Sequence, residues 1–335
     1  MCPLLSDPQI DFNSQHRKIM ADQDLATKAP EVDAQEDSEQ PQPSMTEHCT
    51  SDRPTPAGEV PTGELTKLNG VDVYIAKPSD YPHAPSKLLL LLTGGTGLKS
   101  TNNQLQADKF AREGYLVVMP DQFEGDIAPN TIMPAEEQPS WVEQIKLAAA
   151  QTTKAFLIDM WLARHTPEKV LPLLHKVIEG AKEEFADAIA NGGGIYGAGY
   201  CFGARYILIL GGKHAHPVAG GQDSKPQDDV EQGVVDKGPE IKVGAVAHPT
   251  VVTKEELAAI QVPVSLALVD NDPVFPDDVV KAGKEALEKN GVEHEIKTYA
   301  GVPHGFAVIG SYDDQNIASE QQVAFEQMLG WLQAH

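Results

Sequence analysis

Short apolar segments alternate with amphipathic ones from about residue 60 to the end of this chain. The apolar segments include KLLLLL at 87–92, YLVVMP at 115–120 and VSLALV at 264–269, each bounded by turn residues. A strand that is buried on both faces is a continuous apolar run, and alternation with helices is typical of parallel strands. The pattern therefore predicts an α/β fold, with a mostly parallel central sheet covered by helices on both faces.

The same reading gives the expected elements along the chain. We predict strands over 71–78, 87–97, 115–121, 193–200, 242–250, 262–272 and 293–301, and helices over 104–114, 141–165, 169–190, 204–212, 254–260, 276–291 and 318–335. No internal repeat is evident.

Two segments differ from this pattern. Residues 1–55 are rich in Asp, Glu, Gln, Ser and Pro, and such a segment buries too little apolar area to offset its ordering entropy. We therefore predict a disordered acidic extension over 1–55 and one domain over 56–335, with Met20 and Met45 as alternative translation starts. Residues 211–240 are acidic and glycine-rich, which indicates a surface insertion.

Charge and motifs exclude several classes of protein. The net charge of −23 disfavours nucleic-acid binding, which needs clustered Lys and Arg, and no phosphate-binding glycine motif follows a strand. Three scattered cysteines predict a reducing compartment, which we take as the cytoplasm, and no apolar run is long enough to span a membrane. We expect a monomer or homodimer that acts on a small molecule without a cofactor or metal; His214 and His216 lack the spacing of a closed metal site.

The stretch GIYGAGYCFGARYILIL at 194–210 places one cysteine between two glycines. It reads as a strand, the pentapeptide Gly199-Tyr200-Cys201-Phe202-Gly203, and then a helix. Gly-x-nucleophile-x-Gly at a strand-to-helix turn is the nucleophile elbow of α/β-hydrolases. The glycines remove side chains that would collide at the turn, and the helix N-terminus favours a thiolate at Cys201.

Two further polar residues follow predicted strands. Asp272 comes after VSLALVDN, and His304 lies in GVPHGF after the last strand. Nucleophile, acid and histidine in this order are typical of α/β-hydrolases, and ligands bind beyond the carboxyl ends of the strands. The sequence thus predicts a Cys201–His304–Asp272 triad, with Asp270 and Asp277 as rivals for the acid.

The chain resembles the dienelactone hydrolase family, cysteine-nucleophile α/β-hydrolases related to carboxymethylenebutenolidase. The segments CTSDRPTPAGEVPTGE, GYCFGARY, HPTVVTKEEL, DNDPVFP and GVPHGFAV resemble its fungal-type members, from about residue 49 to the end. The resemblance implies the same three triad roles. It also implies that the loop 92–97 supplies an oxyanion-hole donor, here the backbone N–H of Gly95 beside that of Phe202.

Two departures from the family pattern bear on the substrate. The best-described members carry an acid at the position of Gly94 and a carboxylate-binding arginine at the position of Val308. We therefore expect neutral, fairly apolar esters or lactones to be preferred. Gly94, Tyr200 and His248 are our candidates for the substrate-binding wall, with a structural hydrogen bond as the alternative role of His248.

The expected function is hydrolysis of an activated ester or enol lactone through a thioester intermediate. A thiolate is a good leaving group, so it suits substrates whose own leaving group is stabilised. A thiol redox sensor or peroxide-reactive protein that uses the same cysteine is one alternative, although Cys2 and Cys49 lie in the predicted extension. A non-catalytic binding protein on the same fold is the other.

Overall fold

The computed structural model describes residues 50–129, 153, 156–217 and 234–335. Most of the predicted extension (1–49), the first part of the helix expected over 141–165, and the centre of the expected insertion (218–233) lie outside these residues.

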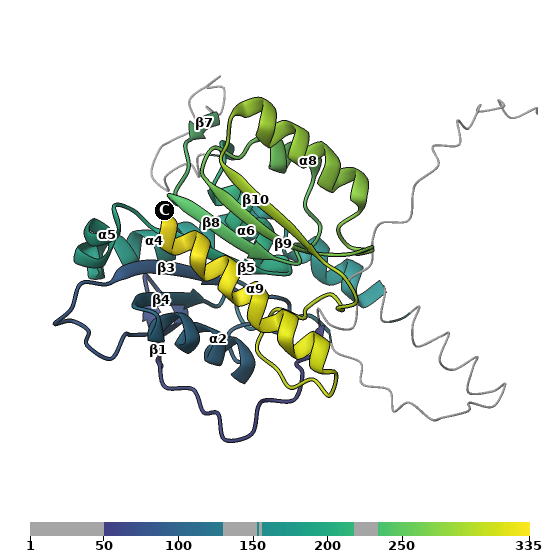
Figure 1. Ribbon diagram of the computed structural model, residues 1–335. Coiled ribbons are helices and arrows are strands. Elements are labelled where there is room, and N and C mark those ends of the chain that lie inside the picture. Colours follow the sequence, from purple (N-terminus) through teal and green to yellow (C-terminus); the bar gives the residue numbers. More distant parts are fainter. Residues whose placement is uncertain (1–49, 130–152, 154–155, 218–233) are drawn as a thin grey trace, which may run out of the picture. The chain divides into compact units, whose positions relative to one another are not determined.

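The core of the described chain is an eight-stranded sheet with the strand order β1-β2-β4-β3-β5-β8-β9-β10 (Figure 1). From β4 to β10 every neighbouring pair is parallel, whereas β1–β2 and β2–β4 are antiparallel. The strands are β1 Glu64–Leu68, β2 Val71–Ala76, β3 Lys87–Leu92, β4 Tyr115–Pro120, β5 Tyr196–Tyr200, β8 Val243–Ala247, β9 Val264–Val269 and β10 His294–Tyr299. This confirms the predicted fold class.

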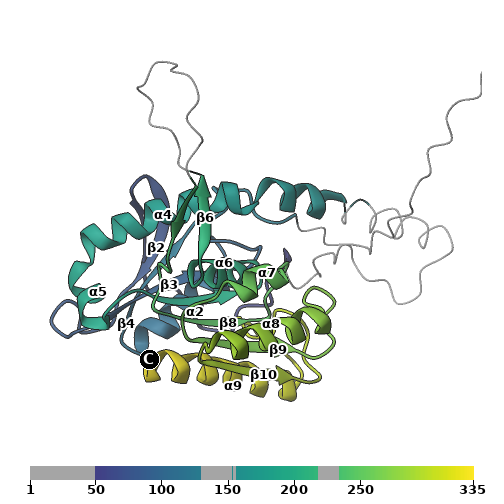
Figure 2. The ribbon, with the colours of Figure 1, turned by 90° about the horizontal axis from the view of Figure 1, so that it is seen from above.

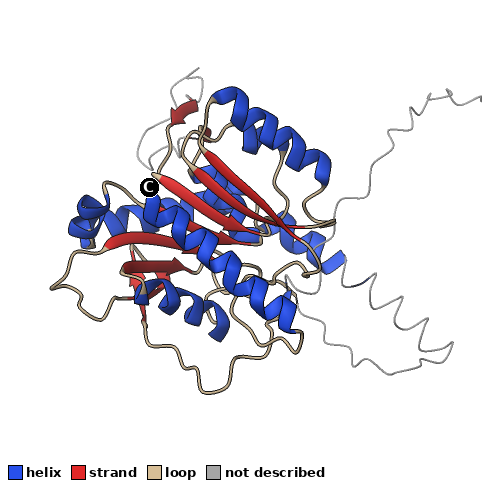
Figure 3. Ribbon diagram, viewed as in Figure 1, coloured by secondary structure: helices blue, strands red, loops and turns tan. Residues whose placement is uncertain are grey.

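Helices cover both faces of the sheet (Figures 2 and 3). The side chains of α2 and α9 pack on one face, and those of α4 to α8 pack on the other. The helices are α2 Thr101–Arg112, α4 Pro167–Glu184, α5 Ala186–Gly192, α6 Phe202–Leu210, α7 Lys254–Ala258, α8 Asp277–Asn290 and α9 Gln315–Ala334, and a further helical segment spans 156–164. β3 and β4 are buried on both faces, as their continuous apolar runs require.

Three parts of the fold differ from the sequence-based expectation. β1 was not expected, because four of its five residues are exposed and it has no apolar pattern. The helix expected over 169–190 is two helices, with a break at Phe185, where φ is −122°. Part of the expected surface insertion pairs as two short antiparallel strands, β6 His214–Pro217 and β7 Val234–Lys237.

The described chain begins within the stretch that we assigned to the extension. Ser100 Oγ donates to Asp52 Oδ1 at 2.9 Å, and Asn102 Nδ2 donates to the Arg53 carbonyl at 2.7 Å. Residues 50–55 thus bond to the start of α2, so the packed part of the chain begins before residue 56. Within the described ranges, no helix combines the length and apolar character that crossing a membrane requires.

Candidate active site

Cys201 sits on a sharp turn between β5 and α6. Its backbone has φ 51° and ψ −118°, and its N–H donates to the Ala247 carbonyl at 3.1 Å. A Cβ on Gly203 would lie 2.4 Å from the carbonyl carbon and oxygen of Leu92, and one on Gly199 would lie 2.8 Å from Ala204 Cα. Both glycines are therefore required for the close approach of main chains at this turn.

His304 and Asp272 form a buried pair at the same edge of the sheet. His304 Nδ1 lies 2.6 Å from Asp272 Oδ2, and each side chain is only 2% exposed. Asp272 Oδ1 accepts a hydrogen bond from the Val274 N–H at 3.1 Å, which fixes the carboxylate. The rivals Asp270 and Asp277 are exposed. The geometry therefore places Asp272, and not a rival, on the histidine.

Thr250 links the histidine to the cysteine, and the sequence analysis did not single it out. Its hydroxyl lies 3.3 Å from Cys201 Sγ and 3.1 Å from His304 Nε2. It follows β8 in the stretch AVAHPT, from which we had selected only the histidine. The signal in the sequence that could have indicated Thr250 was its position as a polar residue after a buried strand.

His248 is fully buried beside the catalytic candidates. Its ring centroid lies 4.9 Å from that of His304, and neither of its ring nitrogens has a hydrogen-bond partner among the described residues. Burial, with a contribution from the charge of His304, lowers the pKa of His248 well below its ordinary value. The ring is thus a neutral imidazole with one free donor and one free acceptor.

The loop after β3 approaches Cys201 closely. A Cβ on Gly94 would lie 3.2 Å from Cys201 Cβ and 3.7 Å from Sγ, so glycine leaves room in front of the sulfur. Gly95 is the next residue of this loop. Phe202 begins α6, so its N–H is one of the four at a helix N-terminus that have no acceptor within the helix. Both predicted oxyanion-hole donors thus belong to backbone segments next to Cys201.

A small pocket opens onto Cys201. Its volume is about 30 Å³. The lining residues come from the start of the described chain, the β3–α2 region and the site loops: Ser51, Asp52, Arg53, Gly94, Thr96, Asn102, Asn103, Cys201, His248, Gly305, Val308, Ile309 and Tyr312. A larger cleft of about 910 Å³ lies beside β1 and β2, but none of the predicted site residues lines it.

One cation of this pocket was missed by the sequence analysis. The Arg53 guanidinium lies 5.0 Å from the centre of the Tyr312 ring. Asp52 lies beside it, and burial raises the pKa of this carboxyl, although hydrogen bonds from Ser100 and Thr96 oppose the shift. Arg205, the arginine nearest to Cys201 in sequence, instead pairs with Glu256 at 2.7 Å.

The residues on either side of Cys201 make contacts within the fold. The Tyr200 hydroxyl accepts a hydrogen bond from Gln106 Nε2 at 2.9 Å, so its hydrogen-bond partner is a residue of α2. The Phe202 ring lies 4.9 Å from the Trp161 ring and 5.5 Å from the Phe123 ring. Trp161 is fully buried and belongs to the core.

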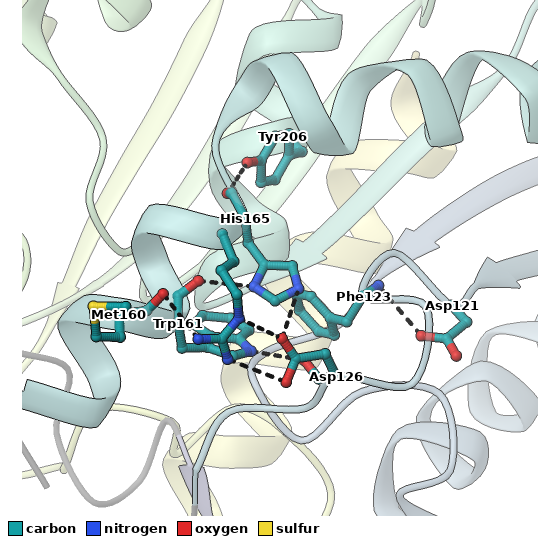
Figure 4. Close-up of polar contacts among 8 residues, drawn as sticks. Asp121, Phe123, Asp126, Met160, Trp161, His165 and Tyr206 are labelled. Carbon is teal, nitrogen blue, oxygen red and sulfur yellow. Dashed lines mark hydrogen bonds and ion pairs between the residues drawn. The ribbon is translucent and has the colours of Figure 1, made fainter.

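A polar cluster holds Trp161 in place (Figure 4). Trp161 Nε1 donates to the Asp126 carbonyl at 2.7 Å, and the Asp126 carboxylate accepts from Arg164 Nε at 2.9 Å. His165 Nδ1 lies 2.8 Å from the Trp161 carbonyl, while the Tyr206 hydroxyl donates to the His165 carbonyl at 2.8 Å. The cluster joins the loop after β4 to α6, and so supports the turn on which the cysteine stands.

A cysteine on a strand-to-helix turn, with an aspartate and a histidine following it on later loops of a mostly parallel sheet, is the arrangement of an α/β-hydrolase. Within that class the chain belongs to the dienelactone hydrolase family, which it matches over residues 71–222 and 231–335. It is a carboxylic ester or lactone hydrolase, as the sequence predicted.

Curated fungal proteins and solved bacterial structures resemble this chain. Hydrolase pyvD of Aspergillus violaceofuscus is 30% identical over 80% of this chain and 89% of its own length. Hydrolase tropI of Talaromyces stipitatus is 27% identical over 81% and 89%. A thermophilic esterase from Thermogutta terrifontis has the same fold, with a TM-score of 0.53 and 14% identity over 80% of this chain and 94% of that one.

Proposed function

We propose that this protein hydrolyses activated carboxylic esters or enol lactones through a thioester formed on Cys201. The observation that carries the proposal is the buried series of contacts from Asp272 to His304, and through Thr250 to Cys201 Sγ. A carboxylate on Nδ1 holds the imidazole so that Nε2 faces the nucleophile, which is the arrangement of a general base and its orienting acid.

The proposed reaction has two halves. His304 holds the thiol proton, the thiolate forms a bond to the carbonyl carbon, and the carbonyl π electrons move to oxygen. The N–H groups of Phe202 and Gly95 stabilise this oxyanion, an effect worth about 3–4 kcal/mol in other enzymes. The carbon–oxygen bond to the leaving group then breaks, and the leaving enol or alcohol takes the proton from His304. Water activated by His304 hydrolyses the thioester.

The pocket supports a neutral substrate. Val308 contributes an apolar wall, and the lining of the pocket holds one basic side chain, Arg53, and one carboxyl, Asp52. His248 presents an unpartnered neutral ring, and a buried polar group without a partner costs about 1–3 kcal/mol. A hydroxyl or carbonyl of the substrate that bonds to this ring recovers that free energy, so we assign His248 to substrate binding.

The test is hydrolysis of p-nitrophenyl acetate and of a neutral enol lactone by the purified full chain. We expect turnover by the wild-type protein, none by Cys201→Ala, and an acyl adduct on the peptide that carries Cys201 when the reaction is quenched in acid and analysed by mass spectrometry. Turnover by Cys201→Ala at the wild-type rate contradicts the proposal. Peroxide oxidation of Cys201 with no ester turnover favours the redox alternative.

A further inference from the structure

The Thr250 hydroxyl contacts both of the groups that must exchange a proton in the proposed reaction. Its oxygen is 3.3 Å from Cys201 Sγ and 3.1 Å from His304 Nε2, and the side chain is completely buried. The Thr250 N–H also donates to the Cys201 carbonyl at 3.3 Å. Backbone and side chain together hold this residue against the nucleophile.

The hydrogen-bonding capacity of a hydroxyl fits this position. A threonine hydroxyl donates one proton and accepts others, whereas Nδ1 of His304 is already engaged by Asp272. When the hydroxyl donates to Sγ, it accepts from Nε2–H, and the pair is a thiolate and an imidazolium. When the thiol donates to the hydroxyl, the hydroxyl donates to Nε2, and the pair is neutral. The two arrangements differ only in the positions of two protons along the same contacts.

The backbone at this point favours one orientation of the side chain. Threonine is β-branched, so few χ1 rotamers are available, and His248 and Val251 on either side of the Pro249-Thr250 step have positive φ values of 38° and 58°. The Val251 N–H donates to the Val274 carbonyl, in the loop that carries Asp272. The turn after β8 is therefore tied to both the nucleophile and the acid loop.

We propose that Thr250 is a catalytic residue that relays the proton between Cys201 and His304; this rests on the proposed function. In one concerted step the S–H bond breaks as a new O–H bond forms on Thr250, while the original hydroxyl proton forms the Nε2–H bond. The threonine hydroxyl is regenerated, no alkoxide forms, and no electron is transferred. The reverse step returns the proton when the cysteine is released.

Two readouts test the relay. The first is the rate of Cys201 alkylation by iodoacetamide against pH, with Cys201→Ala as the blank. Thr250→Val keeps the shape of the side chain but removes the hydroxyl, so we expect alkylation at pH 7 to slow by about tenfold or more and its midpoint to move to higher pH. Thr250→Ser restores the hydroxyl, and we expect it to remain within about threefold of the wild type.

The second readout is the dependence of kcat/KM on the fraction of D2O. Two protons in motion give a curved dependence for the wild type and for Thr250→Ser, and a linear one for Thr250→Val. A linear dependence in the wild-type enzyme overturns the relay without any variant. An unchanged alkylation profile in a folded Thr250→Val protein overturns it as well.

A matched substitution controls for stability. Thr253 caps α7 at the surface, its hydroxyl accepts from the Glu256 N–H at 3.2 Å, and it does not contact the site. Thr253→Val is expected to lower the melting temperature and to leave alkylation unchanged. If wild-type protein hydrolyses no ester while Cys201 alkylation still depends on the Thr250 hydroxyl, the proposed function fails and the proton relay stands.

Discussion

Replacement of Asp272 by asparagine tests the acid of the site. The substitution keeps the size of the side chain, and its Oδ1 can still accept from the Val274 N–H, so the turn after β9 is preserved. What changes is the partner of His304. An amide N–H that faces Nδ1 forces the imidazole proton to Nε2, and that tautomer cannot accept a proton from the thiol.

The size of the effect follows from the burial of the pair. The two side chains are 2% exposed and their atoms are 2.6 Å apart, so the contact is a desolvated, charge-assisted hydrogen bond. Removing one partner of such a pair costs about 3–5 kcal/mol. If that loss falls on the transition state, kcat/KM decreases by about 10²- to 10⁴-fold, since about 1.4 kcal/mol corresponds to tenfold.

The assay is steady-state hydrolysis of p-nitrophenyl acetate, with the melting temperature measured in parallel. Asp270→Asn is the matched control, because Asp270 is exposed and lies two residues away in the same turn. We expect wild-type activity and an unchanged melting temperature from Asp270→Asn, and a lower melting temperature from Asp272→Asn, which should still be folded at the assay temperature. If Asp272→Asn retains more than about a tenth of the wild-type kcat/KM, a loss under 1.4 kcal/mol, the carboxylate does not orient the histidine and the reasoning is refuted.

Four further outcomes are expected. Gly203→Ala should lower the free energy of unfolding in urea by about 3 kcal/mol or more, because its methyl group meets main-chain atoms of β3; Gly330→Ala, with open space around it, should not destabilise the fold. Gly94→Ala should lower kcat/KM with little change in melting temperature, because the methyl group stands 3.7 Å from the sulfur. A neutral enol lactone should have a higher kcat/KM than its carboxylate-bearing analogue; a tenfold preference for the carboxylate that Arg53→Gln abolishes would refute this. The lowered pKa of His248 keeps its ring neutral as pH rises from 6 to 9. His248→Gln should therefore reduce kcat/KM by the same factor at every pH in that range. If the substitution instead shifts the acidic side of the pH profile of kcat/KM, His248 itself titrates there.

The sequence was sufficient to predict those parts of the structure that burial alone decides. β3 and β4 are continuous apolar runs, and the glycines around Cys201 indicate a turn that no other residue fits. Edge strand β1 has mainly exposed residues, so it leaves no periodic signal. The break at Phe185 was hidden because the apolar pattern of α4 continues into α5.

Part of the site could also be predicted from buried strands, because polar residues that follow them are candidates for the site. The cysteine, the histidine and Asp272 each follow a buried strand, and chain order relates them. Thr250 also follows a strand, but a threonine after His-Pro is ordinary in a turn and nothing in the sequence distinguishes it. Arg53 precedes the first strand of the sheet, so only the folded chain could place it in the pocket beside residues about 150 or more positions later.

Positive φ values gather around Cys201. Six non-glycine residues of the described chain have them, and four lie in the site loops: Cys201, His248, Val251 and Asn271. Each such conformation costs about 1–3 kcal/mol, so the four together rival the net stability of about 5–15 kcal/mol of an ordinary domain. The surrounding sheet must hold these loops in backbone conformations that their residues disfavour. On heating, the site should therefore relax before the sheet melts, and activity should be lost at a temperature at which the secondary structure still persists. Selection for greater heat resistance would act on the same loops that carry the candidate catalytic side chains, so these loops have little freedom to become rigid.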